Sequence, residues 1–141
     1  MLKGIPPIIS PELIKILMEM GHGDEMVLAD GNFPAASHAR RFIPGYGHGV
    51  SDFLRAILEL FPLDTYVTAP IVLMNPVEGD NNPPAIWKEY EEILGKMTGS
   101  PVPFETLERH AFYERSKAAY AILATSEQVP YANIILKKGV L

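Results

Sequence analysis

Apolar residues recur along the chain in two patterns that alternate with each other. Four segments carry them at helical spacing, and these segments predict helices over residues 10–20, 51–61, 83–97 and 111–118. Four shorter apolar runs, rich in branched residues, predict strands over residues 26–29, 65–74, 120–124 and 133–137. Most prolines and glycines lie between these segments, as expected of short elements joined by shaped loops.

The first helix has the clearest boundaries. Ser10 is a good N-cap, Pro11 suits the first helical position, and Glu12 complements the positive end of the helix dipole. Gly21 follows the apolar face and is expected to end the helix in a left-handed conformation.

The alternation of helices with short strands predicts an α/β fold whose helices cover a mixed or parallel sheet. The length of 141 residues fits a single domain covering residues 1–141. Such a chain buries enough surface to need no disulfide or metal for stability.

Composition and charge narrow the function. The chain has no cysteine, so disulfides, thiolate nucleophiles and cysteine-bound metals are excluded. Its net charge of −5 and the lack of a basic stripe argue against a nucleic-acid partner. No run approaches 18 apolar residues, and the first residues do not resemble a signal peptide. We therefore expect a cytoplasmic protein with no membrane partner.

His22 is the first candidate for chemistry, because Gly21 and Gly23 flank it between the first helix and the first strand. Glycines allow close approach of a ligand, and an imidazole exchanges protons near neutral pH. Asp24 and Asp30 are possible carboxylate partners. A loop histidine whose glycines serve only the turn is an equally open interpretation. His22 and Asp24 alone do not make a metal site, and no phosphate-binding glycine motif is present.

Two later segments have the composition of a sugar site. One begins at Arg109 and continues through His110 to Arg115, with two aromatic residues between. The other is Tyr131-Ala132-Asn133. Aromatic rings suit the C–H faces of a sugar, and Tyr and Asn both donate and accept hydrogen bonds. The first segment also fits the beginning of an ordinary amphipathic helix.

Taken together, separated motifs resemble the RbsD/FucU family of sugar mutarotases along the whole chain. The matching segments are residues 2–13, 19–25, 29–34 and 131–140. Arg109 followed by Ala111-Phe112-Tyr113-Glu114-Arg115 is similar to the L-fucose branch of that family.

This resemblance implies a compact three-layer α/β/α domain and an acid/base mutarotase of L-fucose that needs no cofactor and no metal. It implies that His22 is the proton donor. It also implies that the sugar is bound by a set of polar and backbone groups, namely Asp30, Arg109, Tyr131, Ala132 and Asn133. We expect Asp30 either to orient His22 or to accept a sugar hydroxyl.

The resemblance further implies ring-like homo-oligomers, commonly decamers, with sites near subunit contacts. Two other functions remain open at this point. One is a non-catalytic monosaccharide-binding or transport-associated protein, and the other is a ribose-type pyranase.

Overall fold

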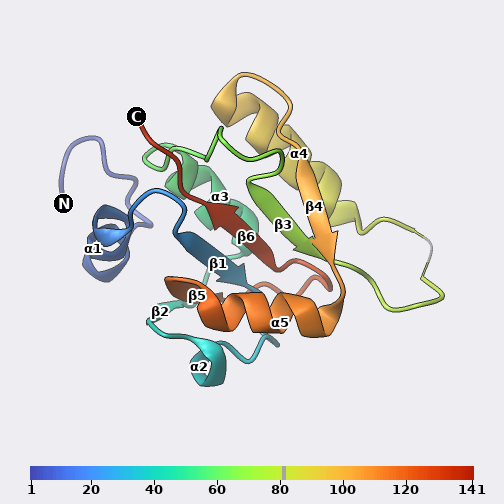
Figure 1. Ribbon diagram of the computed structural model, residues 1–141. Helices are drawn as coiled ribbons and strands as arrows, with labels where there is room; N and C mark the ends of the chain where they lie inside the picture. The colour runs from blue at the N-terminus through green and yellow to red at the C-terminus, as the bar shows by residue number, and fades with distance from the viewer. Residues whose placement is uncertain (81) are drawn as a thin grey trace.

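Six strands form one mixed sheet in the order β2-β5-β1-β6-β3-β4 (Figure 1). The computed structural model describes residues 1–80 and 82–141. The strands are β1 (Glu25–Ala29), β2 (Phe42–Gly45), β3 (Ile71–Met74), β4 (Phe104–Leu107), β5 (Ala121–Thr125) and β6 (Ile134–Lys137). β6 is antiparallel to its neighbours β1 and β3, whereas the other three pairs are parallel. Five strands therefore run in one direction and β6 runs in the other.

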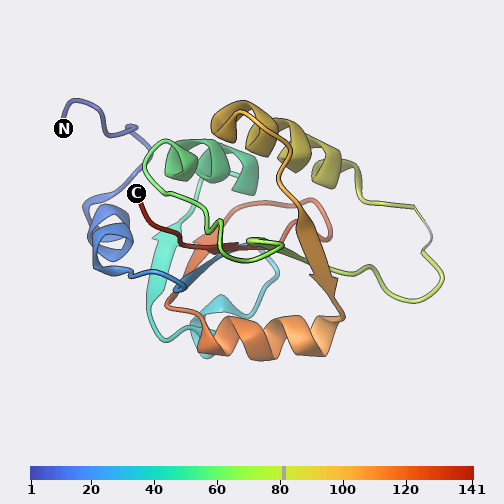
Figure 2. The same cartoon turned by 45° about the horizontal axis from the view of Figure 1, so that its top comes forward.

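Helices cover both faces of this sheet, which confirms the three-layer α/β/α prediction (Figure 2). One core lies under α1 (Pro11–Glu19), α3 (Val50–Leu58) and α4 (Ala85–Thr98). The other lies under α2 (Ala35–His38) and α5 (Arg109–Ala118). In β1 the side chains alternate between the two cores, as the two-residue period of a strand requires. Among the described residues, no helix is both long and apolar enough to cross a bilayer.

The first helix begins as predicted and ends differently. Ser10 caps α1 by accepting a hydrogen bond from the N–H of Leu13 at 3.1 Å. At the other end the capping residue is Met20, which is extended, and the left-handed glycine is Gly23 (φ +85°) rather than Gly21. The turn that reverses the chain therefore lies directly after His22.

The two edge strands, β2 and β4, have no counterpart in the sequence prediction, and neither has the short helix α2. The predicted strand 65–74 is wrong over its first six residues, since only Ile71–Met74 are in the sheet. Pro70 has no N–H to give to a ladder, although its carbonyl accepts a hydrogen bond from the N–H of Lys137.

The strand directions define two opposite edges of the sheet. We call the edge where β1 to β5 end and β6 begins the C-terminal edge, and it includes Asp30 and Asn133. We call the opposite edge, where those five strands begin and β6 ends, the N-terminal edge, and it includes Asp24 and Lys138. Every candidate residue can be assigned to one of these two edges.

Candidate active site

Asp30 and Asn133 form a reciprocal pair at the C-terminal edge. The backbone N–H of Asp30 donates to Asn133 Oδ1 at 2.8 Å, and Asn133 Nδ2 donates to Asp30 Oδ2 at 2.9 Å. The other carboxylate oxygen, Oδ1, accepts a hydrogen bond from the N–H of Asn32 at 2.9 Å. Burial raises the pKa of the Asp30 carboxyl, and these hydrogen bonds partly oppose the rise. A carboxylate with a raised pKa is a better proton acceptor than a free one.

Tyr131 lies beside this pair in an unusual backbone conformation. It has φ 59° and is the only residue other than glycine with positive φ among those described. Its phenol oxygen accepts a hydrogen bond from the N–H of Val77 at 3.3 Å, which ties the start of β6 to the loop after β3. Non-glycine residues in this region cost conformational energy and often mark functional sites.

Arg109 is the first residue of α5 and is exposed at the same edge. Glu108 caps the helix by accepting hydrogen bonds from the N–H groups of His110 and Ala111 at 2.9 and 2.6 Å. Within the described part of the chain, Arg109 makes no ion pair. Its guanidinium is therefore available to a ligand.

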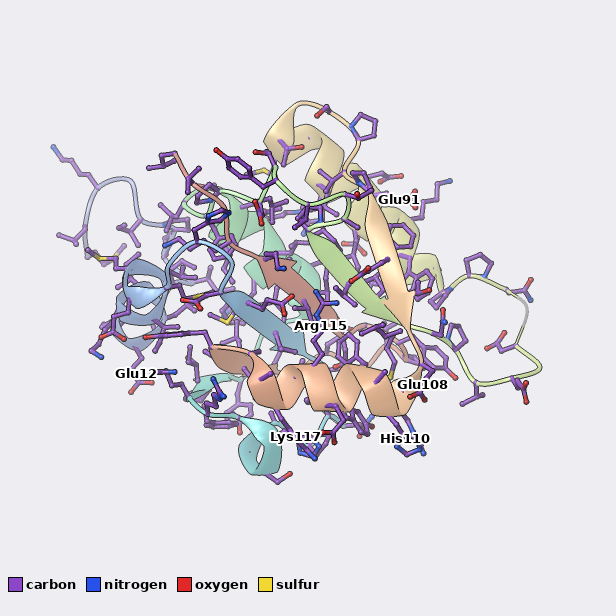
Figure 3. The ribbon with its side chains drawn as sticks, in the orientation of Figure 1. Glu12, Glu91, Glu108, His110, Arg115 and Lys117 are labelled. Carbon is purple, nitrogen blue, oxygen red and sulfur yellow. The ribbon has the colours of Figure 1, made fainter. Side chains whose placement is uncertain are left out.

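Arg115 fixes the orientation of α5 against the sheet. It pairs with Glu25 at 2.8 Å and with Glu105 at 2.5 Å, so one guanidinium joins the helix to β1 and β4. In Figure 3 Arg115 points from α5 toward the strands, whereas His110 and Lys117 point away from them. In the predicted segment from Arg109 to Arg115, Arg115 therefore anchors the helix to the sheet. Arg109, at the start of the helix, has no ion-pair partner among the described residues.

His22 lies at the N-terminal edge, in a loop fixed on two sides. The N–H of Gly23 donates to the carbonyl of Lys138 at 2.8 Å, and the N–H of Lys138 donates to the carbonyl of Asp24 at 2.9 Å. Asp24 Oδ2 accepts a hydrogen bond from the N–H of Gly21 at 2.7 Å. Asp24 therefore shapes the loop, and among the described residues no hydrogen bond joins its carboxylate to the imidazole.

The partner of His22 is Asp64, a residue that the sequence did not single out. His22 Nε2 lies 3.1 Å from Asp64 Oδ1; the carboxylate side chain is 4% exposed and the imidazole 44% exposed. The same oxygen accepts a hydrogen bond from the N–H of Tyr66 at 2.9 Å. These two donors, Tyr66 N–H first, lower the pKa of the Asp64 carboxyl. A buried carboxylate thus fixes one imidazole nitrogen and leaves the other, Nδ1, for a ligand.

A single chain does not bring His22 and Asp30 together. They flank opposite ends of β1, whose five residues span roughly 16 Å at about 3.3 Å per residue. Asp30 therefore does not orient His22 within one chain, because Asp64 holds that place. Asp30, Tyr131-Ala132-Asn133 and Arg109 do share the C-terminal edge, following the strand order β1-β6-β3-β4.

Asp64 lies 42 residues from His22, so no local spacing could have revealed the pair. What distinguishes Asp64 from other carboxylates is its burial, which an isolated aspartate in the sequence does not reveal. In residues 1–80 and 82–141, no three carboxylates or imidazoles converge in a geometry that could hold a metal ion.

Comparisons with known proteins identify relatives of this chain in sequence and in fold. The model of the RbsD / FucU transport protein family matches residues 3–141. An L-fucose mutarotase of Actinobacillus pleuropneumoniae is 50% identical over 140 residues, which cover 99% of this chain and 97% of that protein. The crystal structure of a Streptococcus pneumoniae fucose mutarotase in complex with L-fucose is 52% identical, with a TM-score of 0.94 and 99% of each chain covered.

A more distant structure, Bacillus subtilis RbsD complexed with D-ribose, is 26% identical, with a TM-score of 0.73 and coverage of 100% of this chain and 99% of that one. The match of fold, length and sequence defines a class of small α/β proteins with one mixed sheet. The chain belongs to the RbsD/FucU family. Within that family its sequence is nearer to the fucose mutarotase than to the ribose-bound protein.

We predict that Asp64→Asn reduces the acid sensitivity of the fold. The folded-state pKa of Asp64 lies below its ordinary value of 3.8, so its stabilising effect is complete above that value. The effect is lost as the pH falls through the lower folded-state pKa. Urea unfolding at a series of pH values should therefore show a smaller loss of stability at low pH in Asp64→Asn than in the wild type.

Glu91→Gln is the matched control, because Glu91 is an exposed carboxylate on α4 (Figure 3). This control should follow the wild-type curve. If Asp64→Asn also followed it, the carboxylate would not carry the stabilising contacts assigned to it.

Proposed function

We propose that this protein interconverts the α and β anomers of L-fucose by acid/base-assisted ring opening. The observation that carries the proposal is the identity of about half of all residues to L-fucose mutarotases along the whole chain. The chain also carries groups that suit this chemistry, namely a partly exposed imidazole at the N-terminal edge and, at the C-terminal edge, a carboxylate with a raised pKa and an exposed guanidinium.

The reaction needs two proton transfers. The ring oxygen gains a proton while the anomeric hydroxyl loses one, the bond from C1 to the ring oxygen breaks, and a carbonyl forms at C1. Rotation about the C1–C2 bond and reclosure then give the other anomer. We assign His22 as the proton donor to the ring oxygen and Asp30 as the acceptor for the anomeric hydroxyl. Positioned proton transfer of this kind typically contributes about 10²–10⁴-fold to the rate.

We further propose that each active site contains residues from two copies of the chain. His22 and Asp30 lie at opposite edges of the sheet, so one monosaccharide cannot contact both in a single chain. A second copy that places its N-terminal edge against the C-terminal edge of the first supplies the missing imidazole. Such head-to-tail contacts generate closed rings when the rotation closes, which is consistent with the predicted decamer. The decamer and the cytoplasmic location stay predictions.

Two alternatives have a specific observation in their favour. The family is described as a transport protein family, which suits a protein that binds a sugar without chemistry. A ribose-type activity is suggested by the ribose-bound relative, although 26% identity and a TM-score of 0.73 favour it less than the fucose relative. Measuring anomer exchange on L-fucose, D-ribose and D-galactose separates all three.

We predict that His22→Gln abolishes accelerated anomer exchange while L-fucose binding is largely retained. Glutamine can still contact Asp64, but it cannot donate a proton near neutral pH. Saturation-difference NMR measures exchange, and calorimetry measures binding. His110→Gln is the control, because His110 is exposed on the outer side of α5 and should exchange like the wild type. Full exchange in His22→Gln would remove this residue from the mechanism.

We predict that two inactive variants restore activity in mixed oligomers. His22→Gln lacks the proton donor and Asp30→Asn lacks the acceptor, so each alone should be inactive. If the two residues of one site come from different copies, random mixing of equal amounts makes about one quarter of the sites complete. If both came from the same chain, mixing would restore nothing. Co-expression with two affinity tags, followed by the exchange assay, distinguishes these outcomes.

We predict that Arg109→Ala weakens L-fucose binding by about 10- to 150-fold, because a hydrogen bond to a charged group contributes roughly 1.5–3 kcal/mol. The dissociation constant from calorimetry tests this directly. His110→Ala is the neighbouring control and should bind like the wild type. An unchanged dissociation constant for Arg109→Ala would show that this guanidinium does not contact the sugar.

A further inference from the structure

Helix α4 holds two consecutive carbonyl groups of the segment before β6. The indole Nε1 of Trp87 donates to the carbonyl of Tyr131 at 3.0 Å. One turn further along the helix, the hydroxyl of Tyr90 donates to the carbonyl of Ala132 at 2.6 Å. Trp87 is 9% exposed and Tyr90 is 1% exposed, so the hydrogen bond of Tyr90 is buried and that of Trp87 is partly buried.

Because the peptide bond is planar, these two contacts also fix the directions of the N–H groups of Ala132 and Asn133. No cis peptide occurs among the described residues, so each carbonyl points opposite to the N–H of the following residue. When the carbonyl of Tyr131 points at Trp87, the N–H of Ala132 points away from α4. When the carbonyl of Ala132 points at Tyr90, the N–H of Asn133 likewise points away from α4.

These N–H groups have no acceptor of their own. Within residues 1–80 and 82–141, the backbone N–H groups of Ala132 and Asn133 donate no hydrogen bond. Ala132 is fully buried and Asn133 is 4% exposed. Buried backbone donors are almost always paired, so two unpaired neighbours beside Asp30 indicate a place for a ligand's acceptor atoms.

We propose that Trp87 and Tyr90 are positioning residues that aim the N–H groups of Ala132 and Asn133 at two oxygen atoms of the bound sugar. They act through the backbone and do not contact the sugar themselves. This inference rests on the proposed function, since it assigns the residues that prepare the same site. It also accounts for the left-handed Tyr131, whose conformation is retained because its carbonyl is held on one side and its phenol on the other.

The phenol of Tyr90 suits this role for a second reason. Burial raises its pKa further above the ordinary tyrosine value, so the hydroxyl keeps its proton and remains a donor at neutral pH. The carbonyl of Ala132 therefore keeps its partner whether or not sugar is bound. The donors facing the sugar are oriented before the ligand arrives, which reduces the entropic cost of binding.

Tyr90→Phe tests the proposal because it removes one hydroxyl and leaves the ring in the core. We expect the KM and the dissociation constant for L-fucose to rise about tenfold, since a buried unpaired carbonyl lets the peptide plane turn. We expect kcat to change by less than about threefold, because the proton donor His22 is untouched. Ile93→Val, a buried substitution on the same helix, is the control for lost stability and should leave both constants unchanged. Equal effects of the two variants, or no effect of Tyr90→Phe, would overturn the proposal.

A second measurement follows the two amides directly. Saturating L-fucose should slow hydrogen exchange and shift the NMR resonances of the Ala132 and Asn133 amides in the wild-type protein. Trp87→Phe should then weaken the effect on Ala132 more than the effect on Asn133. If the wild type catalyses exchange yet neither amide responds to fucose, the inference fails while the proposed function stands. If the wild type neither binds nor exchanges fucose, the proposed function itself fails.

Discussion

The length of the buried strand β1 determines how far apart the two parts of the candidate site lie in one chain. β1 has five residues, and its last four are completely buried between the two cores. The loop before it contains His22 and the turn after it contains Asp30, so these two residues flank opposite ends of a strand roughly 16 Å long. Neither can move toward the other, because β1 pairs with β5 on one side and β6 on the other. The separation is therefore a property of the sheet and not of a flexible loop.

The sequence was most informative where a residue's partners are local. The cap at Ser10, the buried runs of β1 and β6, and the amphipathic face of α4 all follow from short-range spacing, and all are present. The two strands that the sequence did not predict, β2 and β4, are the outermost strands of the sheet. Each is four residues long and is paired on one side only. β2 contains Pro44, which an outermost strand tolerates. Because proline argues against a strand in a sequence-based prediction, β2 was not predicted.

The candidate site shows the same division between local and long-range information. His22, Asp30 and Arg109 carry chemical groups that point to function by type, but their relative positions depend on strand order, which spacing does not encode. The pairing of Asp64 with His22 was not predicted, because the two residues are 42 positions apart in the sequence. Trp87 and Tyr90 lie on the buried face of the helix predicted over residues 83–97, and aromatic residues at such positions are explained by packing alone. Each also carries one polar hydrogen, and only the fold shows where that hydrogen goes.

The two edges also differ in how their groups are prepared. At the N-terminal edge a buried carboxylate, Asp64, holds one nitrogen of the His22 imidazole, whose side chain is 44% exposed. At the C-terminal edge two hydrogen bonds join Asp30 to Asn133. The held carbonyls of Tyr131 and Ala132 turn the N–H groups of Ala132 and Asn133 away from α4. Each edge is organised by contacts within its own chain, and neither depends on the other for its geometry. In the two-copy site that we propose, assembly would bring together two surfaces that each chain has already organised by its own contacts.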